Sequence, residues 1–494
     1  MGKYVLSIDQ STQGTKALLF DGTGALVCRT DLPHRQIING KGWVEHDLEE
    51  IWQNTVQVVK NLVEKAGIDK NEICALGISN QRETAACWDR VSKKPVYNAI
   101  VWQCARAAQL CREIEAGGCA PRIREKTGIP LSPYFTAAKL AWIFRNVDGV
   151  REKAAKGEIA VGTIDSWLVY KLTGGKRHQT DYSNASRTQL FNITSLAWDE
   201  EILAIFGIDP SCMAQVTDSD GDYGETDFDG YLEHPIPIRA VLGDSHGALF
   251  GQGCLQPGMI KTTYGTGSSI MMNIGGKPVF SRNGEVVTSL AWSMGGRVNY
   301  VLEGNINYTG AVVTWLKDDL KLIGSARETE QLARSANPED HTYLVPAFSG
   351  LGAPYWDSEA RAAIVGMTRT TGQAEVVKAG LECIAYQITD IVKAMSDTAG
   401  LKIGELRVDG GPTGNAYLMQ FQSDLLGIPV RVPDSEELSG IGAAYTAGLA
   451  AGLFSEDVFG VLKRSSYLPE MTEEERDRKY AGWKDAVARV RTDR

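Results

Sequence analysis

The feature that most constrains the fold is one local pattern that occurs twice: a strand, a turn rich in hydroxyl groups, and a second strand. Residues 4–8 and 16–20 are apolar, and residues 9–15 between them read Asp-Gln-Ser-Thr-Gln-Gly-Thr. Residues 258–263 and 270–274 flank a second such turn, which reads Tyr-Gly-Thr-Gly-Ser-Ser. Strand pairs joined by glycine-containing turns are typical of β-hairpins. The repeat therefore predicts two duplicated α/β domains, residues 1–250 and 251–494.

The segments that follow each hairpin support this division. Apolar residues at helical spacing predict a helix over residues 48–66, and a strand is expected at 73–79. In the second half we expect helices near 310–323 and 374–398, then a strand at 405–408. The charged stretch 471–494 predicts a surface helix.

Composition excludes several classes of partner. Lys+Arg 51 against Asp+Glu 61 gives a formal charge of −10, which disfavours nucleic acid and anionic membranes as partners. Nine cysteines without a C-x-x-C pair indicate reduced thiols. No apolar run is long enough to span a bilayer, and no signal peptide is recognised, so we expect a cytoplasmic protein.

Three glycine- and hydroxyl-containing segments predict a phosphate or nucleotide site. The turn at 9–15 offers N–H and O–H donors, Lys16 adds a positive charge, and Asp9 at a strand end can hold hydrated Mg²⁺. The turn at 264–269 repeats these features, and a third strand ends at Gly410 and Gly411. Each segment alone also fits an ordinary solvated turn, but the three together favour nucleotide binding.

A carboxylate and an arginine–glutamate pair are candidates for the acceptor side of such a reaction. Asp244 follows an apolar strand and precedes small residues that open a helix. It can serve as the base that accepts a hydroxyl proton in phosphoryl transfer, although a helix N-cap fits the same spacing. Arg82 and Glu83 suit vicinal hydroxyls, or form a surface ion pair. Trp102 can pack on a polyol or fill the core.

Longer segments carry a resemblance to a known family. Residues 134–146, which read YFTAAKLAWIFRN, fit the first signature of the FGGY carbohydrate kinases, and residues 362–382 approach the second, departing at Gly380. Residues 346–356 look like the glycerol kinase branch of that family. The similarity extends over residues 3–454 and implies two actin-like (ribonuclease H-like) domains flanking a nucleotide cleft that closes on ATP, Mg²⁺ and a small polyol or sugar.

The resemblance also implies roles for individual residues. Asp244 corresponds to the general base and Asp9 to the carboxylate on the metal side. By analogy we also expect a homo-oligomer, a dimer or a tetramer. The positions that match nucleotide contacts are Thr12, Lys16, Thr266, Gly310, Gly411 and Asn415, and those that match the polyol pocket are Arg82, Glu83, Trp102, Tyr134 and Asp244.

Two pocket positions depart from the glycerol kinase pattern. Ser245 stands where the branch usually carries Gln, and Ser269 stands where Phe usually forms a wall. Ala105 also replaces a usual Arg, and Thr314 a usual Gln. A larger, more polar pocket predicts a four- or five-carbon polyol or ketose as substrate. The alternative is that the pocket repacks and glycerol remains the substrate.

Other functions stay open at this point. A pentulose kinase of the xylulokinase or ribulokinase type is the alternative within the family, although residues 81–84 look more like the glycerol branch. A chaperone-like or filament-forming actin-like ATPase would share the phosphate turns but not Arg82, Glu83 and Trp102. A catalytically weak sugar sensor is disfavoured by the presence of both Asp9 and Asp244.

Overall fold

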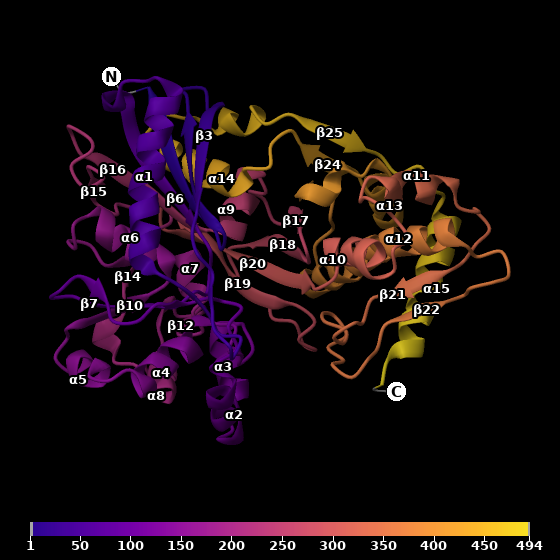
Figure 1. Cartoon of the computed structure of the whole chain (residues 1–494), viewed down its shortest axis with the longest axis horizontal. Coiled ribbons are helices and arrows are strands. Elements are labelled where there is room, and N and C mark those ends of the chain that lie inside the picture. The colour runs from indigo at the N-terminus through magenta and orange to yellow at the C-terminus, as the bar shows by residue number, and fades with distance from the viewer. Residues whose placement is uncertain (1–2, 493–494) are drawn as a thin grey trace.

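The first half of the chain is built on a six-stranded mixed sheet. The computed structural model describes residues 3–492, and Figure 1 shows the two halves of the chain side by side. In the order β15-β16-β6-β1-β2-β3, the last three strands are antiparallel, whereas β6 and β16 run parallel to β1. The strands are β1 (Tyr4–Gln10), β2 (Gly14–Phe20), β3 (Leu26–Pro33), β6 (Ile73–Asn80), β15 (Glu225–Thr226) and β16 (Ile236–Gly243).

The second half repeats this topology in a seven-stranded sheet. Its order is β19-β20-β18-β17-β23-β24-β25. Neighbours from β20 to β17 are antiparallel, whereas β23 and β24 run parallel to β17, as β6 and β16 do to β1 in the first sheet. The predicted duplication, with its actin-like arrangement, is therefore confirmed. The strands are β17 (Ile260–Tyr264), β18 (Ser268–Gly275), β19 (Val287–Met294), β20 (Arg297–Ile306), β23 (Leu406–Asp409), β24 (Val430–Pro433) and β25 (Arg464–Tyr467).

Helices and short strands complete the two halves. The helices of the first half are α1 (Leu48–Ala66), α2 (Ala108–Ala116), α3 (Ala120–Thr127), α4 (Thr136–Asn146), α5 (Val150–Ala154), α6 (Ile164–Leu172), α7 (Tyr182–Ser186), α8 (Glu200–Phe206) and α9 (Asp244–Gly251). Those of the second half are α10 (Gly310–Thr314), α11 (Glu328–Ser335), α12 (Gln373–Ala399), α13 (Ala416–Leu426), α14 (Leu438–Ala450) and α15 (Glu473–Val490). The short strands are β4 (Ile37–Ile38), β5 (Val44–His46), β7 (Ala86–Asp89), β8 (Lys94–Pro95), β9 (Ala99–Ile100), β10 (Ile159–Gly162), β11 (Gln179–Asp181), β12 (Phe191–Asn192), β13 (Ala197–Trp198), β14 (Gln215–Thr217), β21 (Tyr343–Val345) and β22 (Ala363–Val365).

The expected helix over 310–323 is shorter in the structure. After α10 the chain continues as one π-helical segment, Trp315–Asp319, in which Leu320 donates to the Trp315 carbonyl. Lys321 then has a φ of 55°, and this left-handed conformation ends the helix. The first hydroxyl turn is also tighter than expected, because Gln10 pairs with Thr15 and leaves residues 11–14 to reverse the chain.

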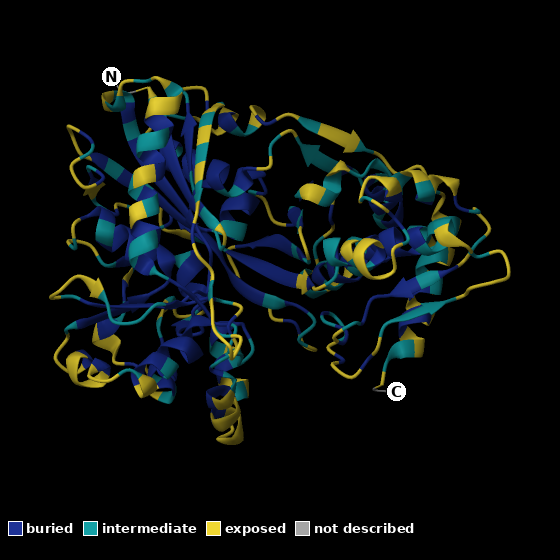
Figure 2. Ribbon diagram, in the orientation of Figure 1, coloured by how far each residue is buried: buried dark blue, intermediate teal, exposed yellow. Residues whose placement is uncertain are grey.

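The second sheet has two faces with different neighbours. Ile270 and Met272 of β18 lie in the core of the second half, whereas Met271 belongs to a cluster with Leu18 and Leu242 of the first half. Side chains alternate along a strand, so every second residue of this sheet faces the first half. Figure 2 shows that central strands such as β1, β6 and β18 are buried, whereas the edge strands β3 and β25 are partly exposed.

One helix from the second half covers the first sheet. The structure packs α14 against β1, β6, β16 and α9 (Figure 1). A β-carbon at Gly442 would overlap the Gly247 carbonyl oxygen, so glycine permits the close approach of α14 to α9. The division of the chain near residue 250 stays a prediction, and α14 ties the two halves together.

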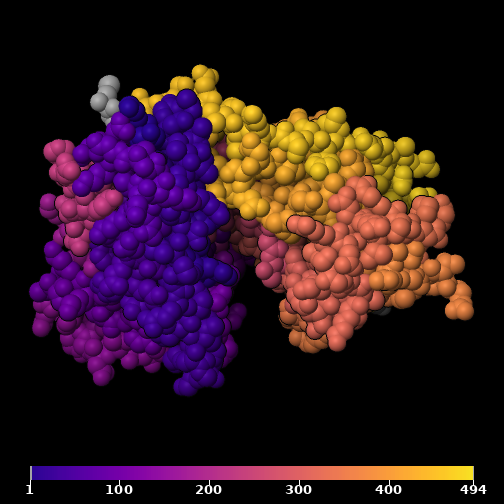
Figure 3. Space-filling view, turned by 45° about the horizontal axis from the view of Figure 1, so that its top comes forward, coloured from indigo at the N-terminus to yellow at the C-terminus, as the bar shows by residue number. Residues whose placement is uncertain are grey.

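The space-filling view shows a deep hollow between the two halves (Figure 3). Within residues 3–492, no helix has the length and apolar character needed to cross a membrane. The nine cysteines are all free thiols, most of them buried, as expected from their spacing.

Candidate active site

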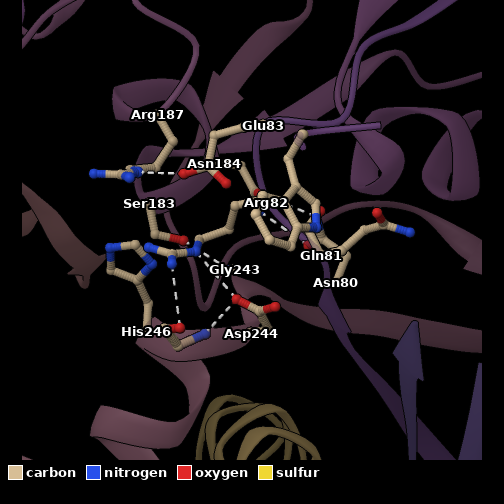
Figure 4. Close-up of polar contacts among 12 residues, drawn as sticks. Asn80, Gln81, Arg82, Glu83, Ser183, Asn184, Arg187, Gly243, Asp244 and His246 are labelled. Atoms are coloured by element: carbon tan, nitrogen blue, oxygen red, sulfur yellow. Dashed lines mark hydrogen bonds and ion pairs between the residues drawn. The ribbon is translucent and has the colours of Figure 1, made fainter. Parts of the chain in front are cut away.

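The candidate catalytic residues meet where three parallel strands end. Asp9 of β1 pairs in register with Ser79 of β6, and Gly243 of β16 pairs with Asn80. The carboxyl ends of β1, β6 and β16 therefore share one edge of the first sheet. Asp9 lies at this edge, as its register shows. The turn after Asn80 and Asp244 at the start of α9 lie there too (Figure 4).

Asp244 is held at the start of α9 with its side chain 35% exposed. Gly243 occupies the N-cap position of α9, so the alternative in which Asp244 caps the helix is excluded. Its Oδ1 accepts hydrogen bonds from the Ser245 N–H at 2.6 Å and from Arg82 Nε at 3.1 Å. One carboxylate oxygen is thereby fixed, and the group remains accessible as a proton acceptor.

Arg82 and Glu83 belong to a buried chain of alternating charges. Arg82 Nη1 lies 3.0 Å from Glu303 Oε2, and Arg187 Nη1 lies 3.1 Å from Glu303 Oε1. Arg187 Nε in turn lies 2.5 Å from Glu83 Oε1, as seen in Figure 4. Glu83 has a φ of 60°, unusual for a residue other than glycine, and this sharp turn sends neighbouring side chains in different directions. The pair is therefore not a surface ion pair.

An aromatic wall stands beside this chain of charges. The rings of Trp102 and Tyr134 are 5.5 Å apart at an interplanar angle of 63°. Trp102 Nε1 donates to Thr12 Oγ1 at 2.9 Å, and its backbone N–H donates to Thr84 Oγ1 at 3.2 Å. The structure thus joins the first hydroxyl turn to the predicted polyol pocket.

Asp9 is a buried carboxylate with unmet hydrogen-bonding capacity. Its Oδ1 has no hydrogen-bond partner among residues 3–492. The pKa of Asp9 is raised to about 6, chiefly by burial and in small part by the charge of Asp244, against the opposing charge of Lys16. Lys16 Nζ itself lies 2.8 Å from Glu437 Oε2, at the start of α14. The Lys16 ammonium has two further N–H donors, and its predicted role in nucleotide binding stays a prediction.

The Asp9 carboxylate fits a Mg²⁺ ion that is bound together with a phosphate. The described residues contain no group of three or more His, Cys, Asp or Glu side chains that could hold a metal ion. Mg²⁺ often takes only one or two protein carboxylates, with phosphate oxygens and water as the other ligands. A single orphaned carboxylate such as Asp9 matches that requirement.

A cavity of about 720 Å³ opens in the second half, between α10, α11 and α13. The predicted residues Gly310, Gly411 and Asn415 line it. Asn415 caps α13 by accepting from the Leu418 N–H at 3.0 Å, and its Nδ2 donates to Thr329 Oγ1. Thr266 does not line the cavity, but its carbonyl accepts from the Ala311 N–H and so fixes the start of α10. The cavity is of a size that holds a nucleotide.

Family models cover nearly the whole chain. The N-terminal domain of the FGGY family of carbohydrate kinases matches residues 4–251, and its C-terminal domain matches residues 260–451. The chain belongs to the FGGY family of carbohydrate kinases.

Individual relatives of this FGGY kinase include glycerol kinases. It is 50% identical over 491 residues to a glycerol kinase of Symbiobacterium thermophilum (99% of this chain, 98% of the relative). It is 50% identical over 493 residues to glycerol kinase 1 of Thermotoga maritima (99% and 100%). A crystal structure of Plasmodium falciparum glycerol kinase with ADP superposes with a TM-score of 0.93 at 36% identity, covering 99% of this chain and 98% of that one. A xylulose kinase from Lactobacillus acidophilus shares the fold at 21% identity, with a TM-score of 0.86 and 98% of each chain covered.

The two serines that depart from the glycerol kinase pattern have different surroundings in this FGGY kinase. Ser245 Oγ accepts from Arg82 Nη2 at 3.2 Å. Ser269 lies on β18, opposite Thr263 and Asn305, and its buried Oγ has no hydrogen-bond partner within the described residues. A hydroxyl without a partner can accept or donate to a ligand hydroxyl.

Sequence reasoning missed Arg187 and Glu303, which carry the buried chain of charges. Arg187 is 2% exposed and Glu303 is 1% exposed. The available signal was a lone carboxylate inside an apolar run, since Glu303 follows Val301 and Leu302. An unpaired charge at such a position would be strongly unfavourable, so partners from elsewhere in the chain were required.

We expect Gly411→Leu to obstruct the nucleotide cavity without disturbing the fold. A β-carbon at Gly411 would meet no atom within 4 Å. The preceding Gly410 is not suitable, because it has a φ of 97° and a β-carbon there would overlap the Tyr264 carbonyl oxygen. A leucine side chain would project into space that the ligand needs, so the Kd for ATP should rise about tenfold to a hundredfold. Titration calorimetry with ATP measures this Kd.

The matched control is Gly404→Leu, where a β-carbon also meets nothing within 4 Å but which lies outside the cavity lining. Its Kd for ATP should be unchanged. Equal ATP affinity in the two variants would place the nucleotide elsewhere.

Proposed function

We propose that this FGGY kinase transfers the γ-phosphate of ATP to a hydroxyl of glycerol or of a somewhat longer polyol. The observation that carries the proposal is Asp244, a partly exposed carboxylate held by Arg82 at the edge of the first sheet. Glycerol kinases at 50% identity over nearly the whole chain support a polyol as the acceptor.

The first half binds the polyol, and the second half binds the nucleotide. Trp102 and Tyr134 pack against the carbon face of the polyol, and Arg82 and Glu83 bind its hydroxyls. Asp244 accepts the proton of the attacking hydroxyl as the oxygen approaches the γ-phosphorus. The nucleotide occupies the cavity lined by Gly310, Gly411 and Asn415. Closure of the halves excludes water, which would otherwise compete with the polyol.

Asp9 supplies the carboxylate on the metal side. Mg²⁺ bound with ATP would neutralise phosphate charge, and the Asp9 carboxylate would hold it through its unpartnered Oδ1. Within residues 11–14, Ser11 and the N–H groups of Gln13 and Gly14 are hydrogen-bonded inside the turn. The Thr12 hydroxyl, which accepts from Trp102 Nε1, still has its own proton to donate to a phosphate oxygen. We further place the enzyme in the cytoplasm as a homo-oligomer.

The test is an ADP-release assay with Mg·ATP against glycerol, erythritol, arabitol, ribitol, xylulose and ribulose. Turnover that depends on one of these acceptors is the expected result. Preference for xylulose or ribulose would replace the proposal by a pentulose kinase. ATP binding without turnover on any acceptor would leave a sugar sensor.

An acceptor longer than glycerol is favoured by one observation, the unpartnered Ser269 hydroxyl. Ser269→Phe would introduce the large aromatic side chain that the glycerol kinase branch usually carries at this position. We expect kcat/KM for erythritol and longer polyols to fall at least about tenfold relative to glycerol, because single methylene groups in a fitted pocket change selectivity by such factors. Competition assays with paired polyols give the ratio directly.

Ser269→Ala is the control, since it removes the hydroxyl without adding bulk. Its preference for longer polyols should fall by less than that of Ser269→Phe. An unchanged selectivity ratio in Ser269→Phe would show that the substrate does not reach Ser269 and would favour glycerol.

A further inference from the structure

Glu303 is a buried carboxylate that faces the other half of the molecule. It lies on β20, in register with Met271 of β18 and Val287 of β19, and its side chain is 1% exposed. Val301, two residues earlier, belongs to the cluster with Leu18 and Leu242, whereas Leu302 lies in the core of the second half. Because side chains alternate along a strand, Glu303 points with Val301 toward the first half.

Its strongest partners come from that other half. Arg82 and Arg187 each place an Nη1 about 3 Å from one of its carboxylate oxygens, at 3.0 and 3.1 Å. Ser289 of the neighbouring strand β19 donates its hydroxyl to Oε1, and His246 Nε2 lies 3.6 Å from the same oxygen. Burial alone would raise the pKa of Glu303, but Arg187 and Arg82 hold it well below its ordinary value. Glu303 is therefore an anion at neutral pH.

The guanidinium of Arg82 is divided among three acceptors. Its Nε donates to Asp244, its Nη1 to Glu303 and its Nη2 to Ser245. A guanidinium binds a carboxylate most strongly through two parallel N–H groups. Glu303 occupies one of the terminal nitrogens, and Asp244 receives only the single Nε bond. Arg82 therefore fixes the position of Asp244 through one hydrogen bond and does not form a two-bond ion pair with it.

We propose that Glu303 is a positioning residue of the second half, which orients Arg82 and through it sets the place of Asp244. Without Glu303, the Arg82 guanidinium is free to rotate and donate two parallel N–H groups to Asp244. That pairing would draw the carboxylate away from the polyol hydroxyl, so it would be misplaced for accepting the proton. Arg187 would also lose its ion pair with Glu303 and keep the one with Glu83. This inference rests on the proposed role of Asp244 as proton acceptor.

The first test is Glu303→Gln, which keeps the shape and removes the charge. We expect kcat to fall about tenfold or more and KM for the polyol to rise, with KM for Mg·ATP unchanged. Glu303 does not line the nucleotide cavity, so a role confined to Arg82 should spare ATP. Glu303→Asp, which restores the charge one methylene shorter, should recover part of kcat.

A matched control separates positioning from general destabilisation. Asp390 is also a buried acid of the second half, where it accepts from Tyr355, Tyr480 and Trp483. Asp390→Asn should lower Tm and leave kcat nearly unchanged. A loss of kcat in both variants that follows their loss of Tm would overturn the proposal.

The decisive measurement is a double-mutant cycle with Arg82→Ala. If Glu303 acts through Arg82, adding Glu303→Gln to Arg82→Ala should change kcat/KM for the polyol by less than about twofold. Multiplicative losses in the double variant would show that the two residues act independently and would overturn the proposal. Should Glu303→Gln fail to fold, Ser289→Ala enters the same cycle, because it removes one hydrogen bond to Glu303 and leaves the carboxylate in place.

Failure of the underlying function is distinguished by the unmodified enzyme. If it releases no ADP with any acceptor, the proposed reaction itself is wrong. If it turns over and the cycle is additive, only the positioning role of Glu303 is wrong.

Discussion

Asp244→Asn is expected to lower kcat about a thousandfold while ATP and polyol still bind. General acid–base catalysis by one positioned side chain contributes about 100- to 10,000-fold, and a neutral amide does not accept the hydroxyl proton. The asparagine Oδ1 can still accept from the Ser245 N–H and from Arg82 Nε, so the local geometry should survive. The side chain is 35% exposed, and its replacement should change the free energy of unfolding little.

The measurement combines ADP release with calorimetric binding of ATP and of the preferred polyol. Asp485→Asn is a suitable control, because this exposed acid on α15 pairs with Arg489, four residues further along the same helix. A variant of Asp244 that retains more than a tenth of the original kcat would show that another group accepts the proton. Lost ATP binding would instead indicate that the substitution disturbs the cleft.

The elements that the sequence predicted well are those specified by local pattern. The helix expected over residues 48–66 has the same bounds in the structure, because its apolar residues face the first sheet and Asp47 and Gly67 cap its two ends. Both hairpins appear where hydroxyl-rich turns separate two apolar runs. The expectation that Asp244 opens a helix after a strand is also confirmed.

The parts that sequence reasoning missed depend on contacts between distant residues. Arg82 and Glu303 are 221 positions apart, and Arg187 and Glu303 are 116 apart. Neither pairing leaves a periodic or local signal. Lys16 shows the same limit, since its position beside the first turn was evident but its partner Glu437, 421 positions away, was not. The packing of α14 on the first sheet is likewise a tertiary contact that no composition change marks.

Asp9→Asn is expected to shift activity and stability in opposite directions. Activity should fall about 100- to 1,000-fold, because the preorganised charge on the metal side of the phosphate is lost. Stability should rise at neutral pH, since burial raises the pKa of Asp9 to about 6 from an ordinary value of 3.8 and its Oδ1 has no partner among the described residues. The amide has nearly the same shape and carries no charge that burial penalises.

The pH dependence follows from the raised pKa. The folded state binds this proton more tightly than the unfolded state does, so the stabilisation by protonation is complete below about pH 4 and is lost as the pH rises through about 6. At pH 7.5 the ionised carboxylate lowers the free energy of unfolding by on the order of 1–3 kcal/mol, and Asn removes that penalty. With an unfolding entropy of about 2.1 cal/mol/K per residue, Tm should rise by about 1–3 °C at pH 7.5. The difference between the two proteins should shrink at pH 4.5, and scanning calorimetry at both pH values, without Mg²⁺ or ATP, measures it. A variant that is less stable than the original at pH 7.5 would mean that Lys16 stabilises the Asp9 carboxylate more than burial destabilises it. The Asp9 carboxylate would then contribute to the stability of the fold, and its burial would not be a cost that the protein bears for binding Mg²⁺.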